Sequence, residues 1–245
     1  MKTPRYAALL FDADDTLLDF RVAEHEALGA LFRKMGLELD DEIRALYATV
    51  NRQLWADYEA GAITKEKLIG TRFELLFEKL GRSVDGPATD KAYREELREQ
   101  AQTVEGALEV CGALRASYRM YIVTNGVYTT QVPRLRNSGI AGLMDGVFIS
   151  ERVGHAKPSP LFFEHVMTET GAERRETLIV GDSLTSDIKG GADAGIDTCW
   201  FNPSRSSSED GGVKPTHEIA KLHELIPLLL SYEGGRQICI PRNKS

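Results

Sequence analysis

Two carboxylates separated by one residue stand directly after a short apolar segment. Asp12 and Asp14 follow residues 6–11, and Thr16 comes soon after them. If extended geometry continues past Asp12, the two side chains point the same way, because directions repeat every second residue. Carboxylates so close both stay ionised only with a cation between them or a proton on one. A hard divalent cation such as Mg²⁺ suits these oxygen ligands, although an ordinary Asp-rich turn would look the same.

Three later apolar runs are also followed by polar residues of complementary kinds. These residues are Thr124 and Asn125, then Lys157, then Asp182 with Asp187 one helical turn further on. Each group alone has an ordinary explanation, such as a turn, a solvated lysine or a helix N-cap. The carboxyl ends of parallel strands share one edge of a sheet, so these side chains can converge there. Together they indicate a site suited to phosphoryl transfer through an aspartyl-phosphate.

The apolar pattern predicts the scaffold that brings these groups together. The predicted strands are residues 6–11, 120–123, 146–150, 177–180 and 197–201. From residue 104 onwards they alternate with helical patterns, and Pro133 places one helix start near Thr129 or Thr130. Because such alternation is typical of right-handed βαβ units, we predict an α/β fold with a doubly wound, Rossmann-like parallel sheet. Runs that are apolar throughout indicate strands buried on both faces.

Residues 20–103 show helical periodicity with almost no strand signal. Apolar residues such as Val22 and Leu28 recur at helical spacing, and Thr64 is a predicted N-cap. The predicted helices are about 20–34, 41–60, 65–80 and 93–102, with a turn at 83–88. The sequence therefore predicts a bundle of about four helices inserted after the first strand. The later loop 204–212 is expected to be exposed and mobile.

Composition limits the classes of function. The chain has 245 residues, 42% hydrophobic and 27% charged, which is typical of a globular protein with one large domain or a domain with an insert. Its longest apolar runs fall short of a membrane span, and we expect no secretory signal. Three scattered cysteines, Cys111, Cys199 and Cys239, favour the reducing cytoplasm. A net charge of −7 without a basic cluster argues against a nucleic-acid partner.

Four segments of the chain resemble the motifs of the haloacid dehalogenase (HAD) superfamily of phosphatases. They are Asp12-Ala13-Asp14-Asp15-Thr16, Thr124-Asn125-Gly126, Lys157-Pro158 and Gly181-Asp182-Ser183-Leu184-Thr185-Ser186-Asp187. The helical insert resembles the cap of the first HAD subfamily. The resemblance implies a core domain of residues 1–18 and 104–232 and a cap of residues 19–103, and it leaves the tail 233–245 unassigned.

The resemblance implies a role for each matching residue. Asp12 attacks phosphorus, and Asp14 protonates the leaving oxygen and later deprotonates water. Thr124 and Asn125 bind the phosphoryl oxygens, and Lys157 offsets the negative charge. The dehalogenases of the superfamily lack an acid at the position of Asp14. The resemblance therefore implies a phosphatase or a phosphomutase.

A magnesium site is implied in the same way. The Asp12 carboxylate, the backbone carbonyl of Asp14 and the Asp182 carboxylate would hold Mg²⁺, while Asp187 supports the site indirectly. The metal and a nearby lysine then supply the local positive charge that an acidic protein needs to bind an anionic ester.

Two further segments resemble bacterial pyrimidine 5′-nucleotidases of this superfamily. They are residues 50–64 of the insert and residues 198–202 of the last predicted strand. The resemblance implies a nucleoside monophosphate substrate such as UMP, dUMP or dTMP. We hypothesise that Trp55 or Tyr58 contacts the base, although large aromatics on helices are more often part of a core.

Several alternatives stay open at this point. Arg52 and Lys65 could meet the substrate instead, although charges on helices are usually solvated. The substrate could be phosphoglycolate or a sugar phosphate, and a phosphomutase is a further option. Outside enzymes, a signalling receiver domain also uses acids, a threonine and a lysine on a doubly wound sheet. We expect a monomer or a homodimer.

Overall fold

The central strand of the protein, β1 (Ala8–Phe11), is fully buried and pairs with a parallel strand on each side. The computed structural model describes residues 5–207 and 212–230, and these contain a six-stranded parallel sheet. The sheet order is β3-β2-β1-β4-β5-β6. The other strands are β2 (Arg119–Thr124), β3 (Gly146–Ile149), β4 (Thr177–Gly181), β5 (Asp197–Phe201) and β6 (His217–Ile219). This order confirms the predicted doubly wound, Rossmann-like fold.

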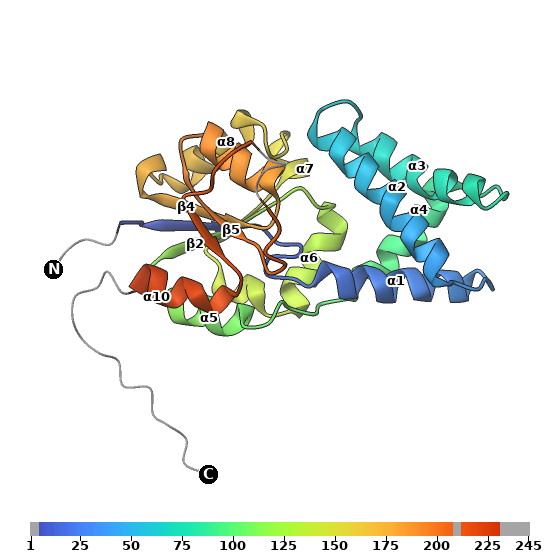
Figure 1. Cartoon of the computed structure of the whole chain (residues 1–245), viewed down its shortest axis with the longest axis horizontal. Helices are drawn as coiled ribbons and strands as arrows, with labels where there is room; N and C mark the ends of the chain where they lie inside the picture. Colours follow the sequence, from blue (N-terminus) through green and yellow to red (C-terminus); the bar gives the residue numbers. More distant parts are fainter. Residues whose placement is uncertain (1–4, 208–211, 231–245) are drawn as a thin grey trace, which may run out of the picture.

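Alternate residues of β1 face opposite sides of the sheet, and both sides are covered. Leu9 and Phe11 belong to the cluster that includes α5 (Ala107–Leu114) and α10 (Leu225–Leu230). Ala8 and Leu10 belong to the cluster on the other face, which includes the buried phenylalanines of α8 (Pro160–Thr170). Figure 1 shows α5 and α10 below the sheet and α8 above it. Burial on both faces explains why the strand is apolar throughout.

Four helices form a group of their own beside the sheet (Figure 1). They are α1 (Phe20–Lys34), α2 (Asp41–Glu59), α3 (Lys65–Lys79) and α4 (Gly86–Leu97). Their shared core includes Phe32, Tyr47, Phe73, Phe77 and Tyr93. Side chains of Asp19, Asp40, Thr64 and Asp85 cap the helix N-termini. We call this group the helical cap.

The chain crosses between the sheet and the helical cap at two adjacent segments, residues 17–19 and 102–104. The Asp19 amide donates to the Gln102 carbonyl at 2.9 Å, and the Val104 amide donates to the Leu17 carbonyl at 3.0 Å. The proposed domain boundaries fall within these segments, and the division into two domains stays a prediction.

Several predicted boundaries were wrong. The fourth helix begins at Gly86 and ends at Leu97, because the Asp85 carboxylate accepts the Ala88 amide and Pro87 fits the first turn. The second helix of the sheet region, α6 (Tyr128–Asn137), places Pro133 beyond its first turn. Val22, predicted on the apolar side of its helix, is 42% exposed.

The last part of the sheet was incompletely predicted. The edge strand β6 was not expected, and the segment after β4 forms the π-helical turn η3 (Leu184–Lys189) followed by α9 (Gly190–Asp193). The unassigned tail and residues 208–211 of the predicted mobile loop lie outside the described residues.

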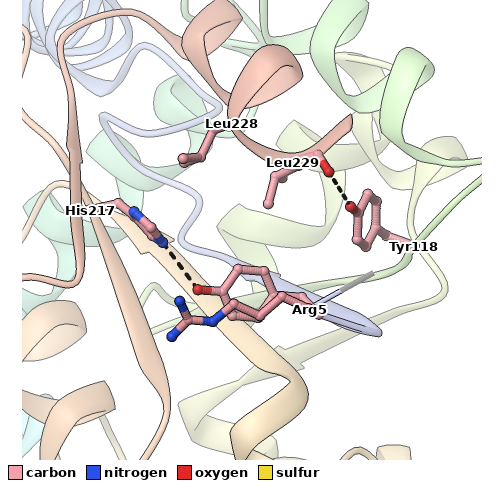
Figure 2. A pocket seen from close by; sticks show the side chains of 6 residues that line it. Arg5, Tyr118, His217, Leu228 and Leu229 are labelled. Carbon is pink, nitrogen blue, oxygen red and sulfur yellow. Dashed lines mark hydrogen bonds between the residues drawn. The ribbon is translucent and has the colours of Figure 1, made fainter. Parts of the chain in front are cut away.

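The helix α10 is fixed at the edge of the sheet that carries the N-terminal ends of the strands. Figure 2 shows the Tyr118 hydroxyl donating to the Leu229 carbonyl, at 2.8 Å. Nearby, the Tyr6 hydroxyl lies 3.1 Å from His217 Nε2. None of the described helices is both long and apolar enough to cross a membrane.

Candidate active site

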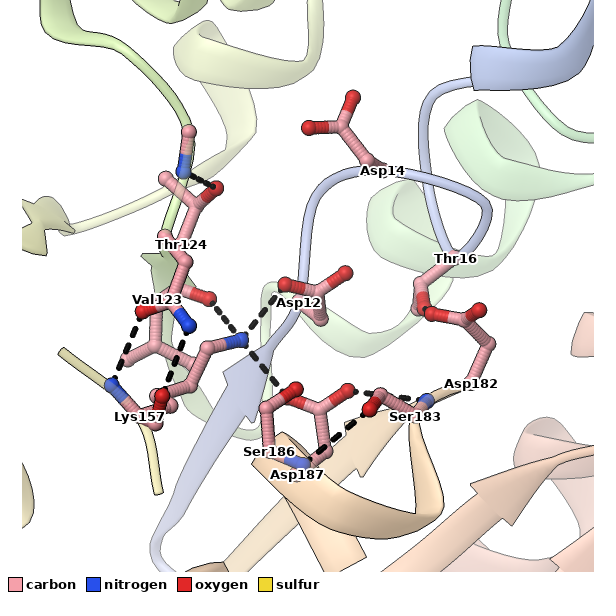
Figure 3. A network of polar contacts seen from close by, with 12 residues as sticks. Asp12, Asp14, Thr16, Val123, Thr124, Lys157, Asp182, Ser183, Ser186 and Asp187 are labelled. Carbon is pink, nitrogen blue, oxygen red and sulfur yellow. Dashed lines mark hydrogen bonds and ion pairs between the residues drawn. The ribbon is translucent and has the colours of Figure 1, made fainter. Parts of the chain in front are cut away.

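Lys157 lies at the centre of the polar groups at the carboxyl edge of the sheet (Figure 3). Its ammonium nitrogen is 2.6 Å from Asp12 Oδ1 and 2.6 Å from Asp187 Oδ1, and it donates to the Val123 carbonyl at 2.8 Å. The side chain is 1% exposed. The ammonium therefore has a protein partner in each of three directions, which fixes its position beside Asp12.

Asn125 fixes the backbone of Lys157. Its Nδ2 donates to the Lys157 carbonyl at 2.8 Å, and its Oδ1 accepts the Lys157 amide at 2.9 Å. The Asn125 side chain thus positions the lysine segment. This was not foreseen from the sequence, from which we expected Asn125 to bind the phosphoryl oxygens.

Three carboxylates gather at the same edge. Ligand oxygens of Asp12, Asp182 and Asp187 all lie within 4.8 Å of one another. Asp187 is fully buried, and its Oδ2 accepts the Ser183 amide at 3.2 Å. Thr16 donates from its hydroxyl to Asp182 Oδ1 at 3.3 Å. A cluster of carboxylate oxygens suits Mg²⁺, which prefers hard oxygen ligands.

The charges of this cluster do not balance when all three carboxyl groups are ionised. Burial alone would lower the pKa of Lys157, but Asp12 and Asp187 raise it above its usual value, so the ammonium stays charged. Burial, with the charge of Asp187, raises the pKa of Asp182 to about 8. Burial also raises the pKa of Asp12, against the opposing effect of Lys157. One lysine among three carboxylates leaves a deficit of positive charge that a divalent cation would fill.

The Asp14 side chain points away from Asp12 (Figure 3). Its Oδ1 is 2.5 Å from Arg134 Nη1, and its Oδ2 accepts a hydrogen bond from Gln131 Nε2 at 2.7 Å. The same Gln131 nitrogen donates to the Thr124 hydroxyl at 3.0 Å. The condition under which Asp12 and Asp14 would point the same way is not met, because the strand ends at Phe11 and the chain turns.

A cleft of about 720 Å³ connects these groups to the helical cap. On the sheet side it is lined by Asp12, Asp14, Thr124, Asn125, Lys157 and Asp182. On the cap side it is lined by Phe20, Glu24, Asn51, Arg52, Trp55 and Glu59, among others. Trp55 also packs against the apolar cluster of α2 and α3, so it is both a core residue and a wall of the cleft. Tyr58 lies against Trp55, with ring centroids 5.8 Å apart.

Two cap residues contact segments that follow the strands at the carboxyl edge of the sheet. Lys65, 6% exposed, donates to the Asn125 carbonyl at 2.6 Å, the Gly126 carbonyl at 3.2 Å and the Ser150 hydroxyl at 2.8 Å. Burial lowers its pKa to about 8, although Glu151 opposes this effect. The expectation of a solvated charge was therefore wrong for Lys65, whereas Arg52 is exposed. Glu59 accepts the Thr185 hydroxyl at 3.0 Å, and burial raises the pKa of its carboxyl.

The structure brings together four of the predicted site residues, Asp12, Lys157, Asp182 and Asp187, and places Thr124 and Asn125 beside them. Sequence reasoning missed Gln131, Arg134 and Glu24 because no local motif marks them. Gln131 and Arg134 lie one turn apart in the helix that follows the Thr124 segment, and that spacing is the only signal that could have indicated them. The chemical roles of all these residues stay predictions.

Comparison with known proteins gives a consistent result. Residues 6–195 match the family of haloacid dehalogenase-like hydrolases. The HAD-hydrolase YfnB of Bacillus subtilis is 42% identical, over 92% of this chain and 96% of that protein. The pyrimidine 5′-nucleotidases PynA of Streptococcus pneumoniae and YjjG of Escherichia coli are 38% and 35% identical. Each match covers 91% of this chain, together with 95% of PynA and 98% of YjjG.

Solved structures share the fold. The crystal structure of YfnB from Bacillus subtilis, bound to magnesium, matches with a TM-score of 0.88, over 92% of this chain and 99% of that one. A dehalogenase structure matches with a TM-score of 0.75 at 21% identity, over 91% of this chain and 97% of that one. The second likeness concerns the fold alone.

Proposed function

This chain belongs to the haloacid dehalogenase-like hydrolases, and from that premise we propose that it is a Mg²⁺-dependent phosphatase acting on a pyrimidine nucleoside 5′-monophosphate. The observation that carries the proposal is the contact of Asp12 with Lys157 inside a cluster of three carboxylates. The family membership leaves the receiver-domain alternative without support. The proposed substrate draws on the similarity to two pyrimidine 5′-nucleotidases.

Asp12 is the proposed nucleophile. One of its carboxylate oxygens attacks phosphorus, and the bond between phosphorus and the ester oxygen breaks. Lys157 already contacts this carboxylate, so its charge offsets the negative charge that gathers as the phosphoryl group is transferred. Thr124 lines the cleft beside Asp12, and its hydroxyl is the proposed hydrogen-bond donor to a phosphoryl oxygen.

Asp14 is the proposed acid and base. It gives a proton to the leaving oxygen and then takes a proton from the water that attacks phosphorus, which releases phosphate and restores Asp12. The Asp14 carboxylate contacts Arg134 and Gln131 in this conformation, so its side chain must turn from these two partners toward the substrate before either transfer.

The carboxylates of Asp12 and Asp182 and the backbone carbonyl of Asp14 are the proposed ligands of Mg²⁺. The ion supplies positive charge that stabilises the phosphoryl oxygens and keeps Asp12 ionised. Asp187 is held by Lys157 and Ser183, so it is proposed to position the lysine and the neighbouring carboxylates.

Phosphate release from a panel of monophosphates, with Mg²⁺ or with EDTA, tests the proposal. The panel contains UMP, dTMP, CMP, AMP, phosphoglycolate and a sugar phosphate. We expect metal-dependent release, fastest with a pyrimidine nucleotide. Replacement Asp12→Asn should lower kcat on the order of 10⁴-fold or more, because an amide cannot form the intermediate.

Asp193→Asn is the matched control, because Asp193 is exposed and pairs only with Lys189 among the described residues. It should turn over like the wild type. Full activity of Asp12→Asn would contradict the covalent step. Phosphate release in EDTA would contradict the proposed metal dependence. A faster reaction with phosphoglycolate or a sugar phosphate would contradict the proposed nucleotide substrate.

A further inference from the structure

A polar pair from the helical cap lines the same cleft as Asp12 but has no part in the chemistry described above. Glu24 lies on α1 and Asn51 on α2, and Asn51 Nδ2 donates to Glu24 Oε1 at 3.0 Å. Asn51 is 6% exposed. Within residues 5–207 and 212–230, Asn51 is the only hydrogen-bond partner of the Glu24 side chain. The second carboxylate oxygen of Glu24 is therefore available to a ligand.

The direction of the Asn51 amide is fixed by chemistry. Arg72 Nη1 lies 3.3 Å from Asn51 Oδ1, and a guanidinium can only donate hydrogen bonds. The amide oxygen of Asn51 therefore faces Arg72, and its nitrogen faces Glu24. Arg72 is itself held by Asp90, with Nε 2.6 Å from Oδ1, and its guanidinium carbon lies 4.7 Å from the Tyr93 ring centroid.

The charges behind the pair balance when Glu24 is ionised. Arg72 and Arg94 both contact the fully buried Asp90, which leaves one positive charge in excess. The Glu24 carboxylate compensates that charge. Burial nevertheless raises the pKa of Glu24 to about 7, against the opposing effect of Arg72, so the group is mostly ionised at pH 8.

Aromatic side chains flank the polar pair. Phe20 precedes Glu24 by one helical turn on α1, Trp55 follows Asn51 by one turn on α2, and both line the cleft. A cleft with aromatic walls and a few fixed polar groups is typical of a site for a flat heterocycle.

We propose that Glu24, oriented by Asn51, accepts the N3–H of a uracil- or thymine-type base and so selects the substrate. This inference rests on the proposed function. Uracil and thymine carry a hydrogen at N3, whereas cytosine has a lone pair there, which a carboxylate oxygen repels. Glu24 is thus a specificity-determining residue, and Trp55 lines the space beside the base.

The replacement Glu24→Gln tests the proposal because it reverses one hydrogen-bonding group at nearly constant shape. Asn51 still donates to the oxygen of the new side chain, so the new amide nitrogen takes the place of the free carboxylate oxygen. A hydrogen-bond donor then faces N3 of the base, which favours cytosine over uracil. At pH 8 the ratio of kcat/KM for UMP to that for CMP should fall about tenfold or more, as expected for one hydrogen bond.

A second variant and a control keep the test independent of folding. Asn51→Ala removes the group that orients Glu24, so the same ratio should fall toward one. Glu26→Gln changes an exposed carboxylate on the same helix, and its ratio should equal that of the wild type. Inhibition by inorganic phosphate, measured in each variant, reports separately on whether the phosphate site has kept its shape.

Each outcome is decisive. A shift of Glu24→Gln toward CMP supports the proposal. An unchanged ratio, or equal losses for UMP and CMP, overturns it and leaves the proposed function standing. A wild-type enzyme that hydrolyses ribose 5-phosphate as well as UMP overturns the choice of a nucleotide substrate, and the base-selecting role of Glu24 fails with it.

Discussion

Lys157 shows how much of the site is arranged before any substrate arrives. Its ammonium contacts Asp12 and Asp187, and the Asn125 side chain hydrogen-bonds both its backbone amide and its backbone carbonyl. Fixed charges stabilise a transition state without reorganisation during the reaction. Asp14 is not yet arranged for its proposed role, because Arg134 and Gln131 hold its carboxylate away from Asp12. The rearrangement that the proposed chemistry needs is therefore confined to one side chain.

Glu24 should make the stability of the protein depend on pH. Burial raises its pKa from 4.5 to about 7, Arg72 opposes the shift, and Asp15 and Asp14 add to it. The folded state then binds more protons than the unfolded state, so this contribution to the free energy of unfolding falls as pH rises from 4.5 to 7. Glu24→Gln removes the titration. As pH rises from 5 to 8, the free energy of unfolding of the variant minus that of the wild type should increase by roughly 1–3 kcal/mol.

Urea unfolding of both proteins in EDTA across this range measures the difference. Glu26→Gln, which changes an exposed carboxylate on the same helix, again serves as the control. A constant difference for Glu24→Gln would show that the carboxyl has an ordinary pKa in the folded protein.

At the scale of elements, the end of β4 shows how closely the backbone and the site are packed. A Cβ added at Gly181 would lie 2.2 Å from Asp187 Oδ2. The strand end therefore requires a residue without a side chain, because Asp187 occupies that space on the π-helical turn η3. Such turns are frequent at functional sites.

Gly181→Ala should displace Asp187 and loosen its contact with Lys157. We expect a loss of about 1–3 kcal/mol in the free energy of unfolding, as is usual for overpacking, together with weaker Mg²⁺ binding. Gly112→Ala is the control, because an added Cβ there meets nothing within 4 Å on an exposed part of α5. It should be neutral or stabilise by up to about 1 kcal/mol. Denaturant unfolding and magnesium titration distinguish the two variants, and equal behaviour would contradict the packing argument.

The sequence predicted the elements whose signals are local. The strand β1 was recognisable because a run buried on both faces is apolar throughout, and the predicted helix cap at Thr64 lies beside a clear helical pattern. The edge strand β6 carries only three residues and no apolar run, so nothing local marked it. The start of α4 was missed because Pro87 was interpreted as part of a turn, although proline fits a first helical turn.

The candidate site residues also divide into those that the order of strands could predict and those that only the packing of helices brings into place. Asp12 and Asp182 directly follow strands, and Lys157 follows β3 after the short helix α7 (Ser150–Val153), so the topology of the sheet brings the three together. Lys65 and Glu24 take their positions from the packing of cap helices against the sheet and against one another. Such contacts join residues far apart in the sequence, so periodicity and spacing could not predict them.

At the scale of the whole molecule, Lys65 joins the helical cap to the sheet. Lys65→Met removes the donor of the Gly126 carbonyl and of the Ser150 hydroxyl, and it leaves the Asn125 carbonyl with only the Ser150 hydroxyl, at 3.4 Å. Because unpaired buried polar groups cost about 1–3 kcal/mol, the cap should spend less time against the sheet, and KM should rise about tenfold. Hydrogen exchange at residues 17–19 and 102–104 should also become faster.

Lys67→Met is the matched control, because Lys67 is exposed on the same helix. Its KM and its exchange rates should stay at wild-type values. If Lys65→Met behaved in the same way, the contact would have no part in holding the cap.

The pairing of residues 17–19 with 102–104 has a consequence for how such a protein can change. The cost of closing a loop grows only with the logarithm of its length, and here the two ends already lie side by side. A longer, shorter or entirely different set of helices could occupy the interval without shifting the register of any strand. The proposed preference for one ester over another could therefore diverge in descendants of this chain, while Asp12 and Lys157 remain as they are.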